Sequence, residues 1–238
     1  MDDIVSVCIA TYNGEKYIKE QLESILSQLP VNGEIIISDD SSTDKTLEII
    51  SSLKDKRIKI FSNQKYKSPI FNFENAIKQS SGDFIFLADQ DDKWFDNKLQ
   101  VMLNALQNHD LVVSNASIGD ESLNIIKDSY FDWRNSRPGF LKNLIKNSYL
   151  GCCIAFNRKL LNVALPFPEN IPMHDMWIGM VAEVYFKPVF IPDKLMIYRR
   201  HQNNATSINE NFTSNNSFMS KLGFRYNLLL AIIKRTLK

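Results

Sequence analysis

The feature that most restricts the fold of this 238-residue chain is an alternation of apolar runs and amphipathic segments in its N-terminal part. Between residues 17 and 29, apolar side chains recur at three- and four-residue spacing, the pattern of a helix with one apolar face. The apolar runs are rich in β-branched or aromatic residues and occupy 4–10, 34–38, 58–61 and 83–88. Strands and helices that alternate in this way predict a three-layer α/β sheet.

The regularity weakens after a predicted helix at 97–108 and a predicted strand at 110–114. The later segments that we predict are a hairpin around Gly119-Asp120, an aromatic loop over Tyr130–Trp133, a strand over 151–156, a helix over 176–186, two short strands near 189–191 and 195–198, and a helix over 217–236. No internal repeat is visible, and residues 202–217 have the Asn/Ser-rich composition of a loop.

Charge and cysteine content exclude several classes of protein. The 28 basic and 27 acidic residues leave a formal charge of +1, which gives no general attraction for nucleic acid. The three cysteines, Cys8, Cys152 and Cys153, lie in apolar runs and indicate reduced thiols in a cytoplasmic protein. The apolar run near the N-terminus is too short for a signal peptide or a membrane span.

Polar groups follow three of the predicted strands at the points where each strand ends. They are Thr11-Tyr12-Asn13, Asp39-Asp40 and Asp89-Gln90-Asp91-Asp92. Ligands of open parallel sheets bind at the carboxyl ends of the strands, so these groups are expected at one edge. Asp40 is placed to accept hydrogen bonds from a nucleobase or a ribose. The three carboxylates of 89–92 favour Mg²⁺ or Mn²⁺, the alternative being a solvated acidic turn that caps a helix.

These stretches, 6–14, 37–44 and 82–94, resemble family 2 glycosyltransferases, and the likeness continues loosely through His174-Asp175 and 198–201. The branch that it resembles contains rhamnosyltransferases of bacterial surface-polysaccharide synthesis. The resemblance implies an α/β fold of the GT-A type, which is Rossmann-like, with a mostly parallel central sheet flanked by helices and here a C-terminal amphipathic helix. A catalytic domain is then expected over 1–214 and the helix over 215–238. Within the domain, 1–100 form the nucleotide-binding half and 101–214 the acceptor and catalytic half.

The resemblance also implies a role for each matching residue. The nucleotide-sugar set is Thr11, Tyr12, Asn13, Glu15, Asp40, Asp89, Gln90, Arg200 and His201. Asp91 and Asp89 belong to the family's DxD motif, which holds the divalent metal, with Asp89 also near the ribose. Asp175 matches the catalytic base. His174 departs from the Glu of many relatives, and it either orients Asp175 or packs. Arg200 and His201 either reach the diphosphate or belong to a surface basic cluster.

The function that follows is an inverting, metal-dependent transfer of a sugar from dTDP-rhamnose or a UDP-sugar to a hydroxyl of a glycan or lipid-linked oligosaccharide. Two other functions stay open, a sugar-phosphate nucleotidyltransferase and a non-catalytic sugar-nucleotide-binding subunit. Neither GxGxxG nor GxxxxGK occurs, which argues against the dinucleotide and P-loop classes.

The C-terminal segment 217–238 combines an apolar stripe with basic residues and contains no acidic residue. Such a helix binds an anionic membrane surface, docks on the core or pairs with a second subunit in a homodimer, and contact with the inner membrane surface ranks first by a small margin. The loops 130–133 and 202–217 are candidate lids over the site, although ordinary surface loops are an equal alternative.

Overall fold

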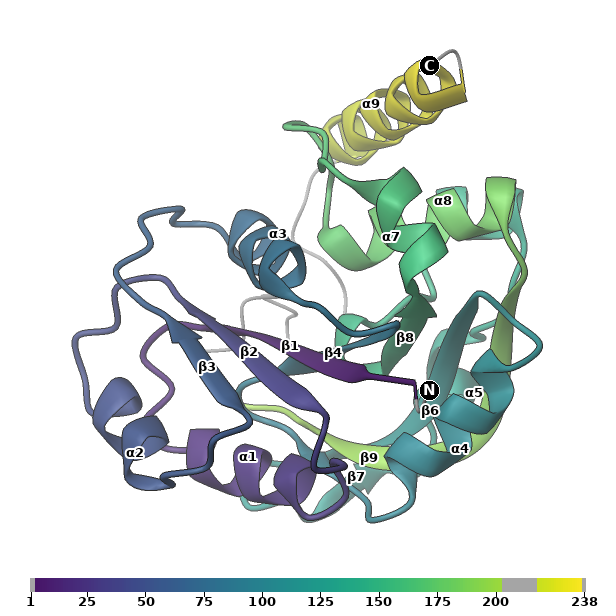
Figure 1. Ribbon diagram of the computed structural model, residues 1–238. Coiled ribbons are helices and arrows are strands. Elements are labelled where there is room, and N and C mark those ends of the chain that lie inside the picture. The colour runs from purple at the N-terminus through teal and green to yellow at the C-terminus, as the bar shows by residue number, and fades with distance from the viewer. Residues whose placement is uncertain (1–2, 203–217, 237–238) are drawn as a thin grey trace.

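The computed structural model describes residues 3–202 and 218–236, with only the backbone given for 218–222. Figure 1 shows a central sheet with α1 (Ile18–Leu26) and α2 (Thr46–Ser52) on one face and α3 (Pro69–Gln79) on the other. The three-layer arrangement predicted for the first hundred residues is therefore confirmed.

The first half of the sheet is parallel. Its strands are β1 (Val5–Thr11), β2 (Glu34–Asp39), β3 (Ile58–Phe61) and β4 (Phe84–Asp89), in the order β3-β2-β1-β4. β1 is central, and its apolar side chains are buried on both faces. The register pairs Thr11 with Asp39 and Ala10 with Asp89, so the carboxyl ends of β1, β2 and β4 reach the same level.

The second half of the sheet is mixed in direction. β8 (Ile154–Asn157) runs antiparallel to β4 and to β6 (Leu111–Gly119), while β9 (Pro188–Arg199) runs parallel to β6. β5 (Lys93–Trp94) pairs with β9, and β7 (Ile125–Lys127) pairs with β6. Because β9 ends beside β5, residues 199–201 come close to the acidic turn that follows β4.

Several predicted elements differ from the structure. The aromatic segment is not a loop but α5 (Tyr130–Arg134), because the Ser129 hydroxyl accepts a hydrogen bond from the Asp132 amide and Asn135 ends the helix in a left-handed conformation. Residues 151–153 form the 3₁₀ turn η1 (Gly151–Cys153) before β8. The two short strands at 189–198 are one irregular strand, β9, with register shifts opposite Ser114–Ser117. The hairpin at Gly119-Asp120 is confirmed.

The remaining helices are α4 (Lys98–Leu106), α6 (Phe140–Ile145), α7 (Arg158–Ala164), α8 (His174–Tyr185) and α9 (Phe218–Thr236). α9 lies against the side of the molecule formed by α7 and α8 (Figure 1).

The described side chains of α9 dock on the core. Leu228 and Ile232 are buried, and Arg225 donates hydrogen bonds to the carbonyl oxygens of Leu144 and Ile145. Arg235 donates to the carbonyl oxygens of Leu165 and Pro166, at 2.7 and 2.6 Å. Two basic side chains of the predicted membrane-binding helix therefore bind the carbonyl oxygens at the ends of α6 and α7. No helix in the described ranges is both long and apolar enough to span a bilayer.

Candidate functional site

A cavity of about 710 Å³ opens at the carboxyl ends of β1, β2 and β4. This volume lies in the range of roughly 300–1,000 Å³ that is typical of small-molecule sites. Its walls come from the strand ends, the loop after β3, η1 and the first turn of α8. The polar residues that line it include Thr11, Tyr12, Asp40, Ser41, Gln64, Lys65, Lys67, Asn72, Asp89, Gln90, Asp91, His174, Asp175 and Tyr198.

The loops after β1 and β2 are fastened to each other. Asp39 is fully buried and accepts hydrogen bonds from the Thr11 hydroxyl and the Ser42 amide, each 2.9 Å long. Asn13 Oδ1 accepts from the Thr43 amide, and Glu15 Oε2 accepts from the Lys45 amide. Asn13 and Glu15 do not line the cavity. Both residues, which were predicted to contact the nucleotide, instead hold the two loops together.

Asp40 lines the cavity beside Ser41. One of its carboxylate oxygens, Oδ1, accepts a hydrogen bond of 2.7 Å from the Tyr66 amide. This contact fixes the position of Asp40 relative to the loop that follows β3, which brings Lys65 and Lys67 to the same cavity.

Gln90 joins the loop after β1 to the turn after β4. Its side-chain amide accepts from the Tyr12 amide at 3.0 Å and donates to the Tyr12 carbonyl at 3.1 Å. A Cβ atom on Gly14 would lie 2.4 Å from Gln90 Oε1, so a larger residue at that position would displace the Gln90 amide. Gln90 thus lines the cavity, and both the oxygen and the nitrogen of its side-chain amide are hydrogen-bonded to the backbone of Tyr12.

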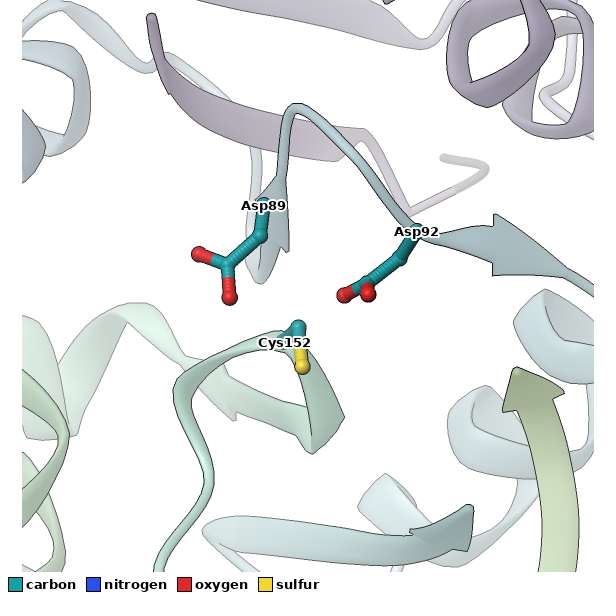
Figure 2. Close-up of side chains that lie close together, drawn as sticks. All are labelled: Asp89, Asp92 and Cys152. Atoms are coloured by element: carbon teal, nitrogen blue, oxygen red, sulfur yellow. The ribbon is translucent and has the colours of Figure 1, made fainter. Parts of the chain in front are cut away.

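The carboxylates of Asp89, Asp91 and Asp92 are crowded. Figure 2 shows the Asp89 and Asp92 side chains, from either side of the turn, directed toward Cys152. One ligand atom each of Asp89, Asp92 and Cys152 lies within 4.8 Å of the other two. Burial, with the nearby charges of Asp91 and Asp175, raises the pKa of Asp89 to about 7. Burial and then Asp91 also raise the pKa of Asp92.

Asp92 lies beneath the cavity and is not one of its lining residues. Its Oδ1 accepts the Arg199 amide at 2.9 Å, while Oδ2 is buried without a hydrogen-bond partner among the described residues. The alternative prediction, that the acidic turn caps a helix, is therefore wrong for Asp92. Asp92 fastens β9 to the acidic turn.

Arg199 holds the backbone of the acidic turn. It is 4% exposed, and its guanidinium donates to the carbonyl oxygens of Asp91, at 2.7 Å, and of Glu121, at 2.6 Å. It also forms an ion pair with Glu20 and lies over the ring of Tyr17. With these contacts Arg199 holds the turn in place and does not line the cavity.

His201 follows on the same strand end. Its Nε2 is 2.7 Å from Asp91 Oδ2, and its ring packs against that of Tyr17. His201 does not line the large cavity, but it contacts the carboxylate of Asp91, which does. Arg200 lines a different, smaller cavity.

Asp175 is the only carboxylate in the first turn of α8. Its Oδ1 accepts the Met176 amide, and its side chain is 8% exposed. Burial raises the pKa of Asp175 to about 6, against the opposing effect of the Met176 and Gly151 amides. Asp175 therefore combines access to the cavity with a pKa close to neutral, which suits a general base.

His174 is buried and stacks on Phe73, with ring centroids 4.1 Å apart. Neither ring nitrogen has a hydrogen-bond partner in the described part of the chain, and burial lowers the pKa of His174 to about 3. The ring is therefore neutral near pH 7. It packs against Gly151, where a Cβ atom would lie 2.9 Å from Nε2, and it does not bind Asp175.

The donor atoms at the cavity fit a hard divalent cation. Asp89 and Asp91, separated by Gln90 in one turn, offer carboxylate oxygens on the cavity wall. Such oxygens are the ligands that Mg²⁺ and Mn²⁺ prefer. The alternative group, Asp89, Asp92 and Cys152, includes a thiol, which is a soft ligand, and of its three members only Asp89 lines the cavity. The pair Asp89 and Asp91 is therefore the better match.

Comparison with known proteins identifies the family. Residues 6–164 match the sequence profile of "Glycosyl transferase family 2". The chain belongs to this family. The stretches 6–14, 37–44 and 82–94, which carried the resemblance, all lie inside the matched region.

Two family 2 relatives illustrate the match. A UDP-Glc:alpha-D-GlcNAc-diphosphoundecaprenol beta-1,3-glucosyltransferase of Escherichia coli is 28% identical over 77% of this chain and 72% of its own length. The dTDP-rhamnosyl transferase RfbG of Shigella flexneri is 31% identical over 86% of this chain and 75% of its own length.

Solved structures confirm the GT-A fold of this family 2 member. Staphylococcus aureus TarS in complex with UDP superposes with a TM-score of 0.67 at 24% identity, over 82% of this chain. The chain spans 60% of that TarS chain. The mannosyltransferase PcManGT of Pyrobaculum calidifontis, in complex with GDP-Man and Mn²⁺, superposes with a TM-score of 0.66 at 19% identity, over 84% of this chain and 58% of its own.

The structure also adds residues that sequence reasoning missed. Lys65 and Lys67 line the cavity of this family 2 chain from the loop after β3. The signal was present, because two lysines follow the carboxyl end of a strand in the parallel half of the sheet. Asn72 and Phe73 also reach the cavity from a helix in which no sequence pattern marked them, and Tyr198 reaches it from a stretch that the resemblance included without giving this residue a role.

Proposed function

We propose that this chain is an inverting, metal-dependent glycosyltransferase with a nucleotide-diphosphate sugar as donor. The observation that carries the proposal is that Asp40, Asp91 and Asp175 line one cavity. These residues come from the loop after β2, from the turn after β4 and from α8, so only the fold brings them together. A nucleotide site, a cation site and a general base then share one space.

The donor is proposed to lie across the strand ends. Its nucleoside occupies the end with Tyr12, Asp40 and Lys65, and its diphosphate lies at Asp89 and Asp91. These two carboxylates would hold a divalent cation, which would neutralise the charge that develops on the departing nucleoside diphosphate. Lys67, on the same cavity wall, adds a positive charge for the phosphates.

Asp175 is proposed as the base. Its carboxylate takes the proton from an acceptor hydroxyl as that oxygen attacks the anomeric carbon. The new bond joins the acceptor oxygen to the anomeric carbon, and the bond to the phosphate oxygen breaks with its electron pair. Attack from the face opposite the leaving group inverts the anomeric configuration. The enclosed position of Asp175 limits competing attack by water.

Donor and acceptor classes follow from the relatives. Their names specify UDP-Glc and dTDP-rhamnosyl donors, and in one case a sugar linked through diphosphate to a lipid. We therefore propose dTDP-rhamnose or a UDP-sugar as donor and a glycan or lipid-linked oligosaccharide as acceptor, in surface-polysaccharide synthesis. A cytoplasmic location with peripheral membrane contact through 217–238, a homodimer and the domain boundary at 214/215 remain proposals as well. Of the predicted lid segment 202–217, all residues after 202 lie outside the described part of the chain.

The proposal is tested by measuring release of nucleoside diphosphate from UDP-glucose and dTDP-rhamnose, with Mn²⁺, with Mg²⁺ and with EDTA. Asp91→Asn is expected to abolish release without changing the melting temperature, while the matched control Asp96→Asn, at an exposed position of the same segment, keeps full activity. Full activity in EDTA or in Asp91→Asn contradicts the proposal. Pyrophosphate release from a nucleoside triphosphate and a sugar phosphate indicates a nucleotidyltransferase instead.

A further inference from the structure

A second cavity of about 150 Å³ lies next to the large one. The two share Leu150, Met173, Asp175 and Tyr198 as lining residues. Asp175 therefore lies where the two cavities meet. The smaller cavity has room for one sugar ring but not for a nucleotide.

The wall of this second cavity is aromatic. Tyr130 and Trp133 come from α5 and Tyr198 from β9. The rings of Tyr130 and Trp133 meet edge to face with centroids 5.6 Å apart, and those of Tyr130 and Tyr198 do so at 6.3 Å. Aromatic side chains fixed in this way offer flat apolar surface and polar hydroxyl groups, a combination that suits the amphipathic face of a sugar.

Two guanidinium groups line the same cavity. Arg134 lies 5.4 Å from the Trp133 ring centroid and donates to the Asn147 carbonyl, but its buried Nε has no hydrogen-bond partner among the described residues. Arg200 donates to the Tyr198 hydroxyl at 3.2 Å. Among the described residues, Asp175 is the only carboxylate in the lining, against the two guanidinium groups. Guanidinium groups bind phosphate oxygens in a bidentate manner, which favours a phosphorylated ligand.

We propose that this second cavity is the acceptor subsite, and that it holds a sugar that carries a phosphate or diphosphate group. Tyr130, Trp133 and Tyr198 contact the ring, Arg134 and Arg200 bind the anionic group, and the reacting hydroxyl points to Asp175. This inference rests on the proposed glycosyl transfer and gives Arg200 a different role from the donor contact predicted from the sequence. It accounts for the unpartnered Nε of Arg134 and for the position of Asp175 between two cavities.

The test uses the wild-type protein with its large cavity filled by UDP or dTDP and Mn²⁺, so that no transfer occurs. Calorimetry then measures binding of N-acetylglucosamine 1-phosphate, of phenyl phosphate as a probe without a sugar, and of methyl α-N-acetylglucosaminide as a probe without phosphate. We expect the two phosphates to bind and the methyl glycoside to bind much more weakly. Arg134→Gln and Arg200→Gln should each weaken phosphate binding roughly tenfold, because each removes charge-assisted hydrogen bonds.

Arg137→Gln is the matched control, because Arg137 is exposed three residues beyond Arg134 and does not line the cavity. Arg134→Lys keeps the charge but loses the planar guanidinium, so it should recover only part of the affinity for the phosphates. If Arg134 had only a structural role, its substitution would weaken binding of the phosphate probes and of the methyl glycoside alike. The inference is overturned if the phosphates do not bind the filled protein, or if the arginine variants weaken UDP or dTDP instead. Failure of UDP and dTDP themselves to bind contradicts the proposed function rather than this subsite.

Discussion

The loops after β1 and β2 and the acidic turn after β4 lie at the same edge of one sheet, but their carboxylates are held in opposite ways. Asp39 and Asp44 are surrounded by hydrogen-bond donors from neighbouring loops. Burial raises the pKa of Asp44, but hydrogen bonds from Thr46 and from the Glu15 amide outweigh burial, so the pKa is lowered overall. On the cavity wall, by contrast, burial raises the pKa of both Asp89 and Asp175.

The difference shows which acids build the frame and which are available to a ligand. A carboxylate whose oxygens already accept several hydrogen bonds contributes to stability and has little capacity left for chemistry. Carboxylates that are crowded and poorly compensated raise the energy of the free protein, and a cation or a proton relieves that cost. Substitutions in the first group should therefore change mainly stability, and substitutions in the second group should change mainly turnover and metal binding.

The largest effect is expected at Asp175. Asp175→Asn removes the proposed base but keeps the shape of the side chain, so turnover should fall at least about a hundredfold while donor binding stays near normal. Steady-state kinetics gives the rate, and a thermal-shift titration with the nucleotide sugar gives the binding. Turnover within a factor of three of the wild type would show that another group accepts the proton.

Arg199 links the two groups, and its removal should damage the frame and the metal site together. Arg199→Ala leaves Glu20 without one partner and the Asp91 carbonyl without its donor. We expect a loss of about 2–3 kcal/mol in the free energy of unfolding and weaker Mn²⁺ binding. Urea denaturation measures the first and calorimetry the second. Arg199→Lys should restore only part of both, because one ammonium cannot reach three separate acceptors; full recovery would refute this account.

The pH profile tests the raised pKa of Asp175. A base must be unprotonated, so kcat/KM should be constant above about pH 6 and fall tenfold per unit below it, since burial places the pKa of this carboxyl at about 6. An ordinary aspartate would keep the rate constant down to about pH 4. The residual activity of Asp175→Asn should lack the fall near pH 6. A profile that is flat to pH 4.5 removes Asp175 from the role of base.

The same contrast explains how much could be predicted from the sequence. The parallel half was predictable because its strands are continuous β-branched runs and its loops follow directly, so Asp40 and Asp89–Asp91 could be placed at one edge. Asn13 and Glu15 were expected in the cavity, but their side chains accept amides of the opposite loop. Sequence position fixes where a loop begins, and hydrogen bonding across loops decides where its side chains point.

The second half was harder because its neighbours are distant in sequence. Asp175 and Tyr198 reach the cavity only through the order β4-β8-β6-β9, which no local pattern encodes. The segment 130–133 was predicted as a loop because Ser129 was not recognised as the N-cap of a helix. For the basic C-terminal helix, membrane contact stays a prediction, and Arg225 and Arg235 bind carbonyl oxygens of the core, as the docked alternative predicts.

Crowding in the acidic turn predicts that one substitution stabilises the metal-free protein. Asp89→Asn removes a negative charge near Asp91 and Asp175, so the free energy of unfolding in EDTA should rise by about 1 kcal/mol. The gain should shrink or reverse with Mn²⁺, because the wild type regains a ligand that the variant binds poorly. Melting curves with EDTA and with Mn²⁺ make the comparison. A loss of stability in EDTA would mean that this carboxylate belongs to the frame.

The smallest effect is expected at Asp44, the counterpart in the frame. Its Oδ1 accepts the amide and hydroxyl of Thr46 at the start of α2, and its Oδ2 accepts the Glu15 amide. Asp44→Ala removes these bonds and should cost about 1 kcal/mol of stability, as for loss of a helix cap, with turnover within about twofold of wild type. Because the pKa of Asp44 is lowered in the folded protein, its contribution is present near pH 7 and is lost as the pH falls through and below its ordinary value of 3.8. Denaturation at pH 7 and pH 3 should therefore show a smaller difference between variant and wild type in acid. A rate loss comparable to that of Asp175→Asn would place Asp44 among the ligand-binding acids and contradict the distinction between the acids of the frame and the acids of the cavity.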